Sequence, residues 1–290
     1  MTTRRADTAG AEPSPTSRAL ARLYDLDLVE DPGDVDLYLA LATRTGGPIL
    51  ELAAGTGRIA VPLTIAGHDV TAVDLDPAML ERAYARARVP VPAVRAVGAL
   101  ELIEGDLLDL DLPTAGTYRL AVIALNSLFL LATRDAQRQA FRTMFRHLAP
   151  GGLAAVDVWL PEPDDLARFD GRMIFEYERR EPETGDTVTK VAAARFDPTT
   201  AVVDLTTIYE EGPPGGTTIR WIRHDALRLV SADELRSMAE DAGLIVDQVG
   251  GDYDLDPIGP GSERAIVIAR RPEADAPHDG LGTLGRHGIE

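Results

Sequence analysis

Between residues 48 and 160 the chain alternates short apolar runs with longer amphipathic stretches. Apolar runs bounded by turn residues predict buried strands. The expected strands are Pro48–Ala53, Asp69–Asp74, Ala99–Glu104, Arg119–Leu125 and Leu153–Val158. The expected helices between them are Arg58–Ala66, Pro77–Arg88 and Arg134–Leu148. Strands that are apolar on both faces and alternate with helices indicate a mostly parallel, doubly wound α/β sheet with helices on both sides.

The pattern of alternation changes after about residue 171. Between Arg172 and Leu229 the chain favours strands, separated by turn residues such as those at Asp197-Pro198 and 212–216. A small antiparallel β insertion is therefore expected. A capping box at Ser231–Glu234 then opens another helix, which Gly243 ends. The sheet is expected to finish with strands at Leu244–Val249 and Arg264–Ala269, which brings it to seven strands.

These patterns divide the chain into a core, an insertion and two tails. The core is expected to comprise residues 18–160 and 230–271, and the inserted antiparallel β lid, or substrate region, residues 161–229. The polar, proline-containing residues 1–17 and residues 272–290 are expected to be disordered tails.

Composition narrows the class of protein. The formal net charge is −18, whereas a nucleic-acid-binding protein needs a basic surface, so we expect no nucleic-acid partner. No apolar stretch is long enough to span a bilayer, and no apolar run follows the first arginines, so we expect no membrane partner and a cytoplasmic location. There are no cysteines, and no residue cluster has metal-ligand spacing. A homo-oligomer remains open.

A glycine-containing loop follows the first expected strand. The sequence Glu51–Arg58 (ELAAGTGR) runs from that strand into a helix, so that glycines allow a ligand to approach the backbone closely. Asp74 ends the second strand, where an acidic side chain is placed to accept hydrogen bonds from ribose hydroxyls. These two features fit both a nicotinamide dinucleotide and an adenosyl cofactor. Glu51 lies in an apolar strand, and a buried carboxylate needs a partner, either loop amides or an amino group of the cofactor.

Four segments together resemble the class I S-adenosylmethionine-dependent methyltransferases, small-molecule type with an inserted β lid. They are ELAAGTGR, GHDVTAVDLDPAML, EGDLLDL and LAPGG. The resemblance covers roughly Tyr24–Val158 and Leu235–Arg270, and implies a Rossmann-like fold, S-adenosyl-L-methionine as cofactor and a small-molecule acceptor. Ala53 stands where the family has the first glycine of its motif. The insertion resembles the lids of small-molecule N- and O-methyltransferases of that family.

The resemblance also implies which residues contact the cofactor. Its contacts would be Tyr24, on an N-terminal helix folded over the cofactor; Glu51, Ala53, Gly55, Gly57 and Arg58 in the loop; Asp74 and Leu75 at the ribose; Met79, Asp106 and Leu107 at the adenine; and Leu125 beside the methyl donor. Arg58 would reach the cofactor carboxylate.

The chemistry of the acceptor is less specified by the sequence. An amine needs only a weak base, whereas a hydroxyl group needs a general base, for which His224 in the insertion is the first candidate. Asn126 would either orient the acceptor or satisfy loop backbone. We therefore expect methyl transfer to a nitrogen or oxygen atom of a small molecule.

Two other functions remain possible from the residues alone. An NAD-dependent oxidoreductase fits the glycine loop, but no tyrosine lies four residues before Lys190, the only lysine. The chain is alternatively a non-methylating S-adenosylmethionine-binding protein, because an intact cofactor loop does not require methyl transfer.

Overall fold

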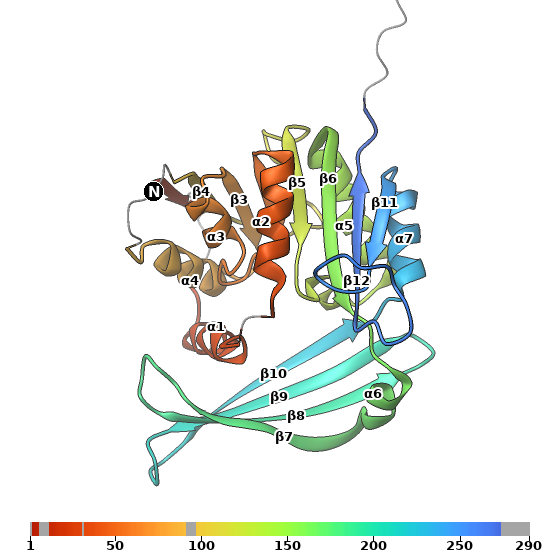
Figure 1. Ribbon diagram of the computed structural model, residues 1–290. Helices are drawn as coiled ribbons and strands as arrows, with labels where there is room; N and C mark the ends of the chain where they lie inside the picture. Colours follow the sequence, from red (N-terminus) through yellow and green to blue (C-terminus); the bar gives the residue numbers. More distant parts are fainter. Residues whose placement is uncertain (1, 6–11, 31, 91–96, 274–290) are drawn as a thin grey trace, which may run out of the picture.

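The protein consists of a layered α/β unit and a separate curved sheet that lies across one edge of it (Figure 1). The computed structural model describes residues 2–5, 12–30, 32–90 and 97–273. The C-terminal tail expected at residues 272–290 lies outside this part of the chain, except for Pro272 and Glu273, which are in neither helix nor strand.

The larger sheet has eight strands in the order β1-β4-β3-β2-β5-β6-β12-β11. Their bounds are β1 Thr2–Arg5, β2 Ile49–Leu52, β3 Val70–Asp74, β4 Ala99–Glu104, β5 Tyr118–Ile123, β6 Leu148–Trp159, β11 Ile245–Gly250 and β12 Arg264–Arg270. All neighbours pair in parallel except β12, which is antiparallel to β6 and to β11. The expected mostly parallel, doubly wound sheet is confirmed, with one additional strand.

The additional strand is β1, within the segment expected to be a disordered tail. Thr2–Arg5 pairs in parallel with Ala99–Leu102 of β4. The N-terminal tail is further shortened because helix α1 begins at Pro15 rather than after residue 17. The sequence TTRR has no hydrophobic alternation that would predict a strand. It pairs through main-chain groups at the edge of the sheet, and this pairing does not depend on the type of side chain.

Helices cover both faces of the larger sheet. One apolar core, which includes Leu41, Ile59 and Leu80, packs α2, α3 and α4 against one face. The other core, which includes Phe141 and Met238, packs α5 and α7 against the opposite face. The helix bounds are α1 Pro15–Asp27, α2 Asp34–Thr45, α3 Ala60–Ile65, α4 Pro77–Ala87, α5 Arg134–His147, α6 Pro163–Arg168 and α7 Ala232–Asp241, with a 3-10 turn at Ser127–Leu130.

Sequence signals set several helix ends. Asp76 caps α4 by accepting a hydrogen bond from the Ala78 amide, with Pro77 at the first helical position. The capping box at Ser231 and Glu234 is present at the start of α7. The helix expected from Arg58 begins at Ala60, because residues 58 and 59 complete the loop.

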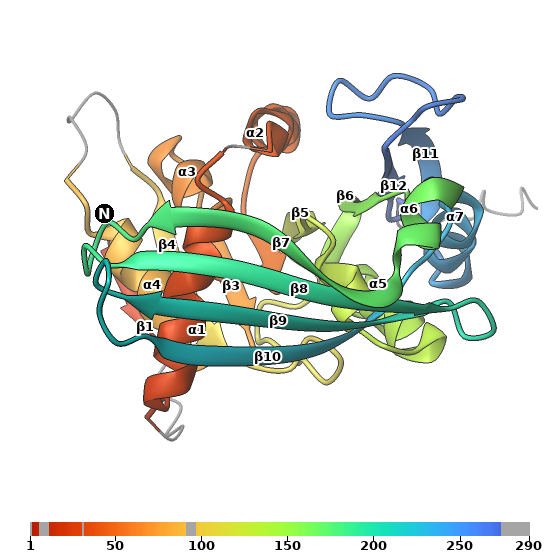
Figure 2. The same cartoon turned by 90° about the horizontal axis from the view of Figure 1, so that it is seen from below.

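The insertion forms a four-stranded antiparallel sheet in the order β10-β9-β8-β7 (Figure 2). Its strands are β7 Asp170–Arg180, β8 Thr187–Asp197, β9 Val202–Gly212 and β10 Ile219–Arg228. One face of this sheet, here the inner face, is directed toward α1 and the carboxyl ends of the parallel strands. The other, outer face looks away from the α/β unit.

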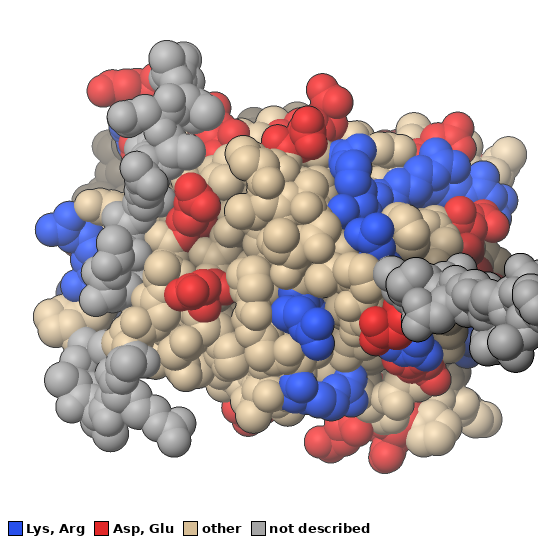
Figure 3. Space-filling view, turned by 90° about the horizontal axis from the view of Figure 1, so that it is seen from above, with Lys and Arg blue, Asp and Glu red and all other residues tan. Residues whose placement is uncertain are grey.

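The opposite end of the molecule carries charges of both signs. Figure 3 shows Lys and Arg gathered on one side of this face, with Asp and Glu distributed around them. Within the described residues, no helix is long and apolar enough to cross a membrane.

Candidate functional site

The glycine loop makes a tight turn between β2 and α3. Ala53, Gly55 and Gly57 have φ angles of 55°, 55° and 74°, in the left-handed region. The Ala54 amide donates to the Val73 carbonyl at 3.0 Å, and the Gly57 amide donates to the Ala54 carbonyl at 3.0 Å. The turn therefore lies against the end of β3, where Asp74 follows.

The two glycines of the loop have different surroundings. A Cβ atom at Gly57 would lie 3.0 Å from the Cβ of Ala83 on α4, so this glycine permits close helix–loop packing. A Cβ atom at Gly55 would meet the ring of Tyr24 at 3.9 Å. Gly55 therefore faces the space beneath α1, and Tyr24 lies over the loop.

The Asp74 carboxylate is joined to the loop by hydrogen bonds. Its Oδ2 accepts from the Gly55 amide at 2.7 Å, and its Oδ1 accepts from the Asp76 amide at 2.9 Å. Burial raises the pKa of Asp74, although these amides oppose the rise. Each oxygen keeps acceptor capacity, which suits a pair of ribose hydroxyls.

Glu51 is a buried carboxyl group with an unsatisfied oxygen. Its exposed fraction is 3%, and its Oε2 has no hydrogen-bond partner among the residues that the structure describes. Burial raises the pKa of Glu51 to about 8, although the charge of Arg58 lowers it. A buried oxygen without a partner indicates that a bound ligand donates a hydrogen bond to it. The ammonium group of a ligand would fit the Oε2 atom of Glu51 in this way.

Arg58 is paired within the protein. Its two terminal nitrogens donate to the two carboxylate oxygens of Asp34 at 2.5 and 2.6 Å, and Asp34 is fully buried. This ion pair fixes the start of α2 beside the loop, and the expected contact of Arg58 with a cofactor carboxylate stays a prediction. Because Asp34 lies 24 residues earlier in the chain, no sequence spacing indicated this partner.

The expected adenine-side residues follow β3 and β4. Leu75 is exposed, whereas Met79 and Leu107 are half-buried. Asp106 is exposed and accepts a hydrogen bond from the Leu108 amide at 2.8 Å. The Gly105 amide donates to the Asp74 carbonyl at 3.0 Å, which brings the loop after β4 beside the ribose-side carboxylate.

The turn after β5 is held by a buried aspartate that sequence reasoning missed. Leu125 and Asn126 have φ angles of 46° and 66°. The Leu125 amide donates to Asp157 Oδ2 at 2.9 Å, and the hydroxyl of Tyr38 donates to the same oxygen at 3.0 Å. Asp157 also pairs with Arg264. The apolar strand around Asp157 gave no sign of this role.

The side chain of Asn126 serves the backbone. Its Oδ1 accepts from the Trp159 amide at 2.6 Å, so the strand ends of β5 and β6 are joined. Of the two roles expected for Asn126, the geometry shows backbone satisfaction, while the residue also lines the adjoining cavity.

A cavity of about 440 Å³ lies between the α/β unit and the inner face of the four-stranded sheet. Tyr24 from α1 and Leu125 and Asn126 after β5 line it on one side. Arg223 and Asp225 of β10 line it on the other side. Tyr24 therefore lies beside both the glycine loop and the cavity, so the two spaces adjoin.

His224 does not line this cavity. It lies between Arg223 and Asp225 on β10, and successive side chains of a strand point to opposite faces. The exposed His224 ring instead hydrogen-bonds the Thr206 hydroxyl at 3.0 Å. The expectation that His224 faces the acceptor is corrected for this reason.

Lys190, the only lysine of the chain, lines the cavity. Its ammonium group pairs with Asp27 at 3.0 Å and with Glu176 at 2.9 Å. Asp27 also accepts hydrogen bonds from the hydroxyls of Tyr177 and Tyr209, at 2.5 and 2.8 Å. Asp27 therefore joins the C-terminal end of α1 to three strands of the four-stranded sheet.

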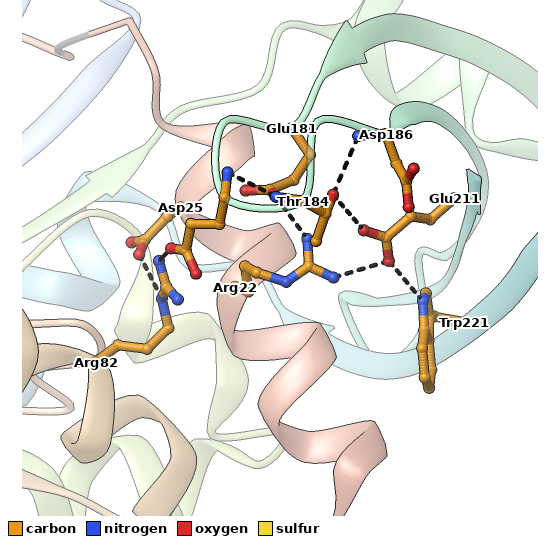
Figure 4. Close-up of polar contacts among 9 residues, drawn as sticks. Arg22, Asp25, Arg82, Glu181, Thr184, Asp186, Glu211 and Trp221 are labelled. Carbon is orange, nitrogen blue, oxygen red and sulfur yellow. Dashed lines mark hydrogen bonds and ion pairs between the residues drawn. The ribbon is translucent and has the colours of Figure 1, made fainter. Parts of the chain in front are cut away.

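Buried ion pairs hold α1 between the two sheets (Figure 4). Arg22 pairs with Glu181 at 3.2 Å and with Glu211 at 2.7 Å, and the carboxylate side chains are 4% and 7% exposed. On the other side, Asp25 accepts from Thr56 of the glycine loop at 2.6 Å and from Arg82 of α4 at 2.6 Å. The contacts of Arg22 with the four-stranded sheet and of Asp25 with the loop and α4 hold α1 in place, and thereby hold Tyr24 over the loop.

Comparison with known proteins places the glycine loop in a recognised domain. A family profile described as a methyltransferase domain matches residues 49–152. The chain is 27% identical over 226 residues to the cypemycin N-terminal methyltransferase of a Streptomyces species, which covers 78% of this chain and 84% of that protein.

Solved structures share the overall fold. The CcbJ methyltransferase from Streptomyces caelestis superimposes with a TM-score of 0.70 and 23% identity, covering 91% of this chain and all of that one. CalS10, an amino pentose methyltransferase from Micromonospora echinaspora solved with bound S-adenosylmethionine, gives a TM-score of 0.63 and 21% identity, covering 87% and 96%.

Proposed function

We propose that this chain, which belongs to the class I S-adenosylmethionine-dependent methyltransferase family, methylates a nitrogen atom of a small-molecule amine. The cavity that adjoins the glycine loop through Tyr24 is the acceptor site. The observation that carries the choice of nitrogen is the set of side chains that line this cavity.

Within the described part of the chain, no histidine lines the cavity. Burial raises the pKa of Tyr24, and burial together with Asp27 raises the pKa of Tyr209 well above its ordinary value, so neither hydroxyl is a base near neutral pH. The lining carboxylates of Asp27 and Glu176 are paired with the ammonium group of Lys190, and that of Asp225 is paired with Arg223, so these groups are engaged within the protein. A hydroxyl acceptor needs a general base, whereas an amine only has to be in its neutral form.

The residues of the loop fit the cofactor. S-adenosylmethionine supplies a methyl group already activated on a sulfonium. The unpartnered oxygen of Glu51 suits the amino group of its methionine part, and Asp74 suits its ribose hydroxyls. Tyr24 and Leu125 line the cavity, and Tyr24 also lies beside the loop, so both would shield the reacting atoms from water. The protein's contribution to the rate is therefore alignment of the two reactants.

Related proteins support an amine acceptor. By their names, one relative is the cypemycin N-terminal methyltransferase and another is an N,N-dimethyltransferase of a dTDP-4-amino sugar from Saccharopolyspora spinosa.

The direct test is formation of S-adenosylhomocysteine by the purified protein with labelled S-adenosylmethionine and a panel of primary amines and matched alcohols. We expect each amine to be converted to an N-methylated product that carries the label. The value of kcat/KM should rise with pH as the amine loses its proton. Transfer only to the alcohols would contradict nitrogen methylation. Cofactor binding without transfer to any acceptor would favour a non-methylating protein, and binding of NADH but not of S-adenosylhomocysteine would favour an oxidoreductase.

Asp74→Ala tests the cofactor site. We expect the dissociation constant of S-adenosylmethionine, measured by calorimetry, to rise at least about tenfold, since ribose hydroxyls lose a charged acceptor. Asp76→Ala is the matched control, because Asp76 caps α4 and lies two residues away. Equal affinities in both variants and the unmodified protein would remove Asp74 from the site.

A further inference from the structure

The inner face of the four-stranded sheet changes from polar to apolar along its strands. Lys190 of β8 pairs in register with Tyr209 of β9, and both line the cavity. Four residues further along β8, Ala194 pairs with Leu205, and Val203 follows on β9. Both strands therefore present polar groups to one end of the cavity and apolar groups to the other.

The next strand, β10, follows the same order. In the direction of the chain, β10 presents Arg223 and Asp225 to the polar end of the cavity. Leu227 and then Leu229, just after the strand, line the apolar end. Arg223 pairs in register with Thr207, and Leu227 with Val203. Three adjacent strands thus change polarity in the same direction, which gives the cavity a polar end and an apolar end.

The polar end lies beside α1 and the cofactor loop. Asp27, one turn after Tyr24 on α1, contacts Lys190 there. Arg223 donates from Nε to Asp225, at 3.0 Å. Tyr24 contributes to the same end and approaches Gly55. The end of the cavity nearest the cofactor loop is therefore lined by paired charges.

The apolar end lies beside the 3-10 turn Ser127–Leu130 and the start of the insertion. The rings of Trp159 and Phe169 meet there with centroids 6.3 Å apart and planes tilted by 53°. Phe129 and Leu130 from the 3-10 turn complete this wall. Leu130 is 47% exposed although it is a large apolar residue, so the wall extends to the surface.

We propose that the acceptor is an amphiphilic amine, whose nitrogen lies at the polar end near Tyr24 and whose aliphatic or aromatic body fills the apolar end. This inference rests on the proposed amine methylation. A polyhydroxylated body is disfavoured because the apolar wall of Trp159, Phe169 and Leu227 leaves most of its hydroxyls without partners, although Ser127 and Arg168 line the cavity nearby. An apolar body of similar length gains from leaving water.

The test is a series of straight-chain primary amines from propylamine to decylamine, with glucosamine as the polar comparison, assayed for S-adenosylhomocysteine formation above pH 9. We expect kcat/KM to rise about threefold to fourfold per methylene group until the cavity is filled, and to be lowest for glucosamine. A flat series, or glucosamine as the best of these acceptors, would overturn the inference while leaving amine methylation intact.

Two neighbouring alanines provide a matched pair of variants. Ala194 lines the cavity, whereas Ala193 pairs with Thr206 and lies on the outer face with His224. Ala194→Phe is expected to lower the ratio of kcat/KM for decylamine to that for propylamine at least about tenfold, because its ring occupies the apolar end. Ala193→Phe is expected to leave this ratio unchanged.

Equal ratios in the two variants would show that chain-length preference does not arise in this cavity, and would overturn the inference. Each variant is first checked for an unchanged thermal shift by S-adenosylhomocysteine, which establishes that the cofactor site has folded. If no amine is methylated, the dissociation constants of the same amines for the S-adenosylhomocysteine complex decide the matter, because a flat series of constants contradicts an apolar subsite even without turnover.

Discussion

Ala53 shows how one residue of the glycine motif is accommodated. Its φ of 55° is a left-handed conformation that L residues adopt at a cost and glycine adopts freely. The family has glycine at the corresponding place, and this chain has the smallest side chain that carries a Cβ atom. The loop therefore has the left-handed backbone conformation at this position, and the Cβ atom of Ala53 makes that conformation strained.

Replacing Ala53 by glycine is expected to stabilise the protein. Ala53→Gly should raise the free energy of unfolding in urea by about 0.5–1 kcal/mol, since relief of the left-handed strain exceeds the added entropy of the unfolded chain. Ala54→Gly is the control: Ala54 is buried and is not in the left-handed region, so this change should destabilise. If both variants lose stability, Ala53 is not strained.

Glu51 makes the stability of the ligand-free protein depend on pH. Its pKa is about 8 in the folded chain and near 4.5 when unfolded, so the folded state holds the proton more tightly. The resulting stability is present below pH 4.5 and is lost as pH rises through 8. Glu51→Gln should therefore increase the free energy of unfolding at pH 9 by on the order of 2 kcal/mol, and change it much less at pH 5. Equal effects at both pH values would contradict the buried-acid assignment.

Binding of the cofactor should be coupled to the same proton. If the amino group of the cofactor pairs with ionised Glu51, binding at pH 7 releases close to one proton, and affinity rises with pH up to about 8. Calorimetry in two buffers of different ionisation enthalpy measures the proton count. Proton release that is the same in Glu51→Gln as in the unmodified protein would assign it to another group.

At the scale of elements, α1 is the connection between the two sheets. Arg22 contacts the ends of β7 and β9, whereas Asp25 contacts the glycine loop and α4. The hydrogen bond and charge of Arg22 also outweigh burial at Glu211 and lower the pKa of that carboxyl group. One helix thus fixes the distance between the cofactor loop and the acceptor cavity.

Removing Arg22 should destabilise this connection strongly. Arg22→Met leaves two buried carboxylates without their cation, and is expected to cost about 3 kcal/mol of unfolding free energy near neutral pH. The loss should shrink as pH falls from 4.5 through the lowered pKa of folded Glu211, because that carboxylate then takes up a proton and gives up its ion pair. Arg18→Met, which breaks the exposed pair with Glu81, is the control and should change stability little. Similar losses in both variants would show that the Arg22 pairs are weak.

At the scale of the whole molecule, the insertion shares a core with the α/β unit. Val203 of β9 and Leu229 after β10 belong to the same apolar cluster as Phe141 of α5 and Val156 of β6. We expect one cooperative transition in differential scanning calorimetry, because neither sheet can be uncovered without exposing that cluster. Two resolved transitions, with only one of them shifted by S-adenosylhomocysteine, would show that the sheets unfold independently.

The sequence by itself determined the elements of the fold and the course of the cofactor loop. Apolar periodicity and caps act over a few residues, so the strands from β2 to β6, the start of α4 and the capping box of α7 were predictable. The glycine loop and Asp74 were predictable for the same reason, because the loop and the strand end that bring them together are each local.

Tertiary structure decided which side chains meet across long separations and which face a strand turns toward the cavity. The ion pairs Arg58–Asp34 and Lys190–Asp27 join residues that are far apart in the sequence, so no local pattern predicts them. The inner and outer faces of β10 were indistinguishable in a strand with polar residues on both, so His224 was placed on the wrong side. Pairing of β1 rests on backbone groups alone. Local patterns fix conformation, whereas burial and pairing depend on the packed whole.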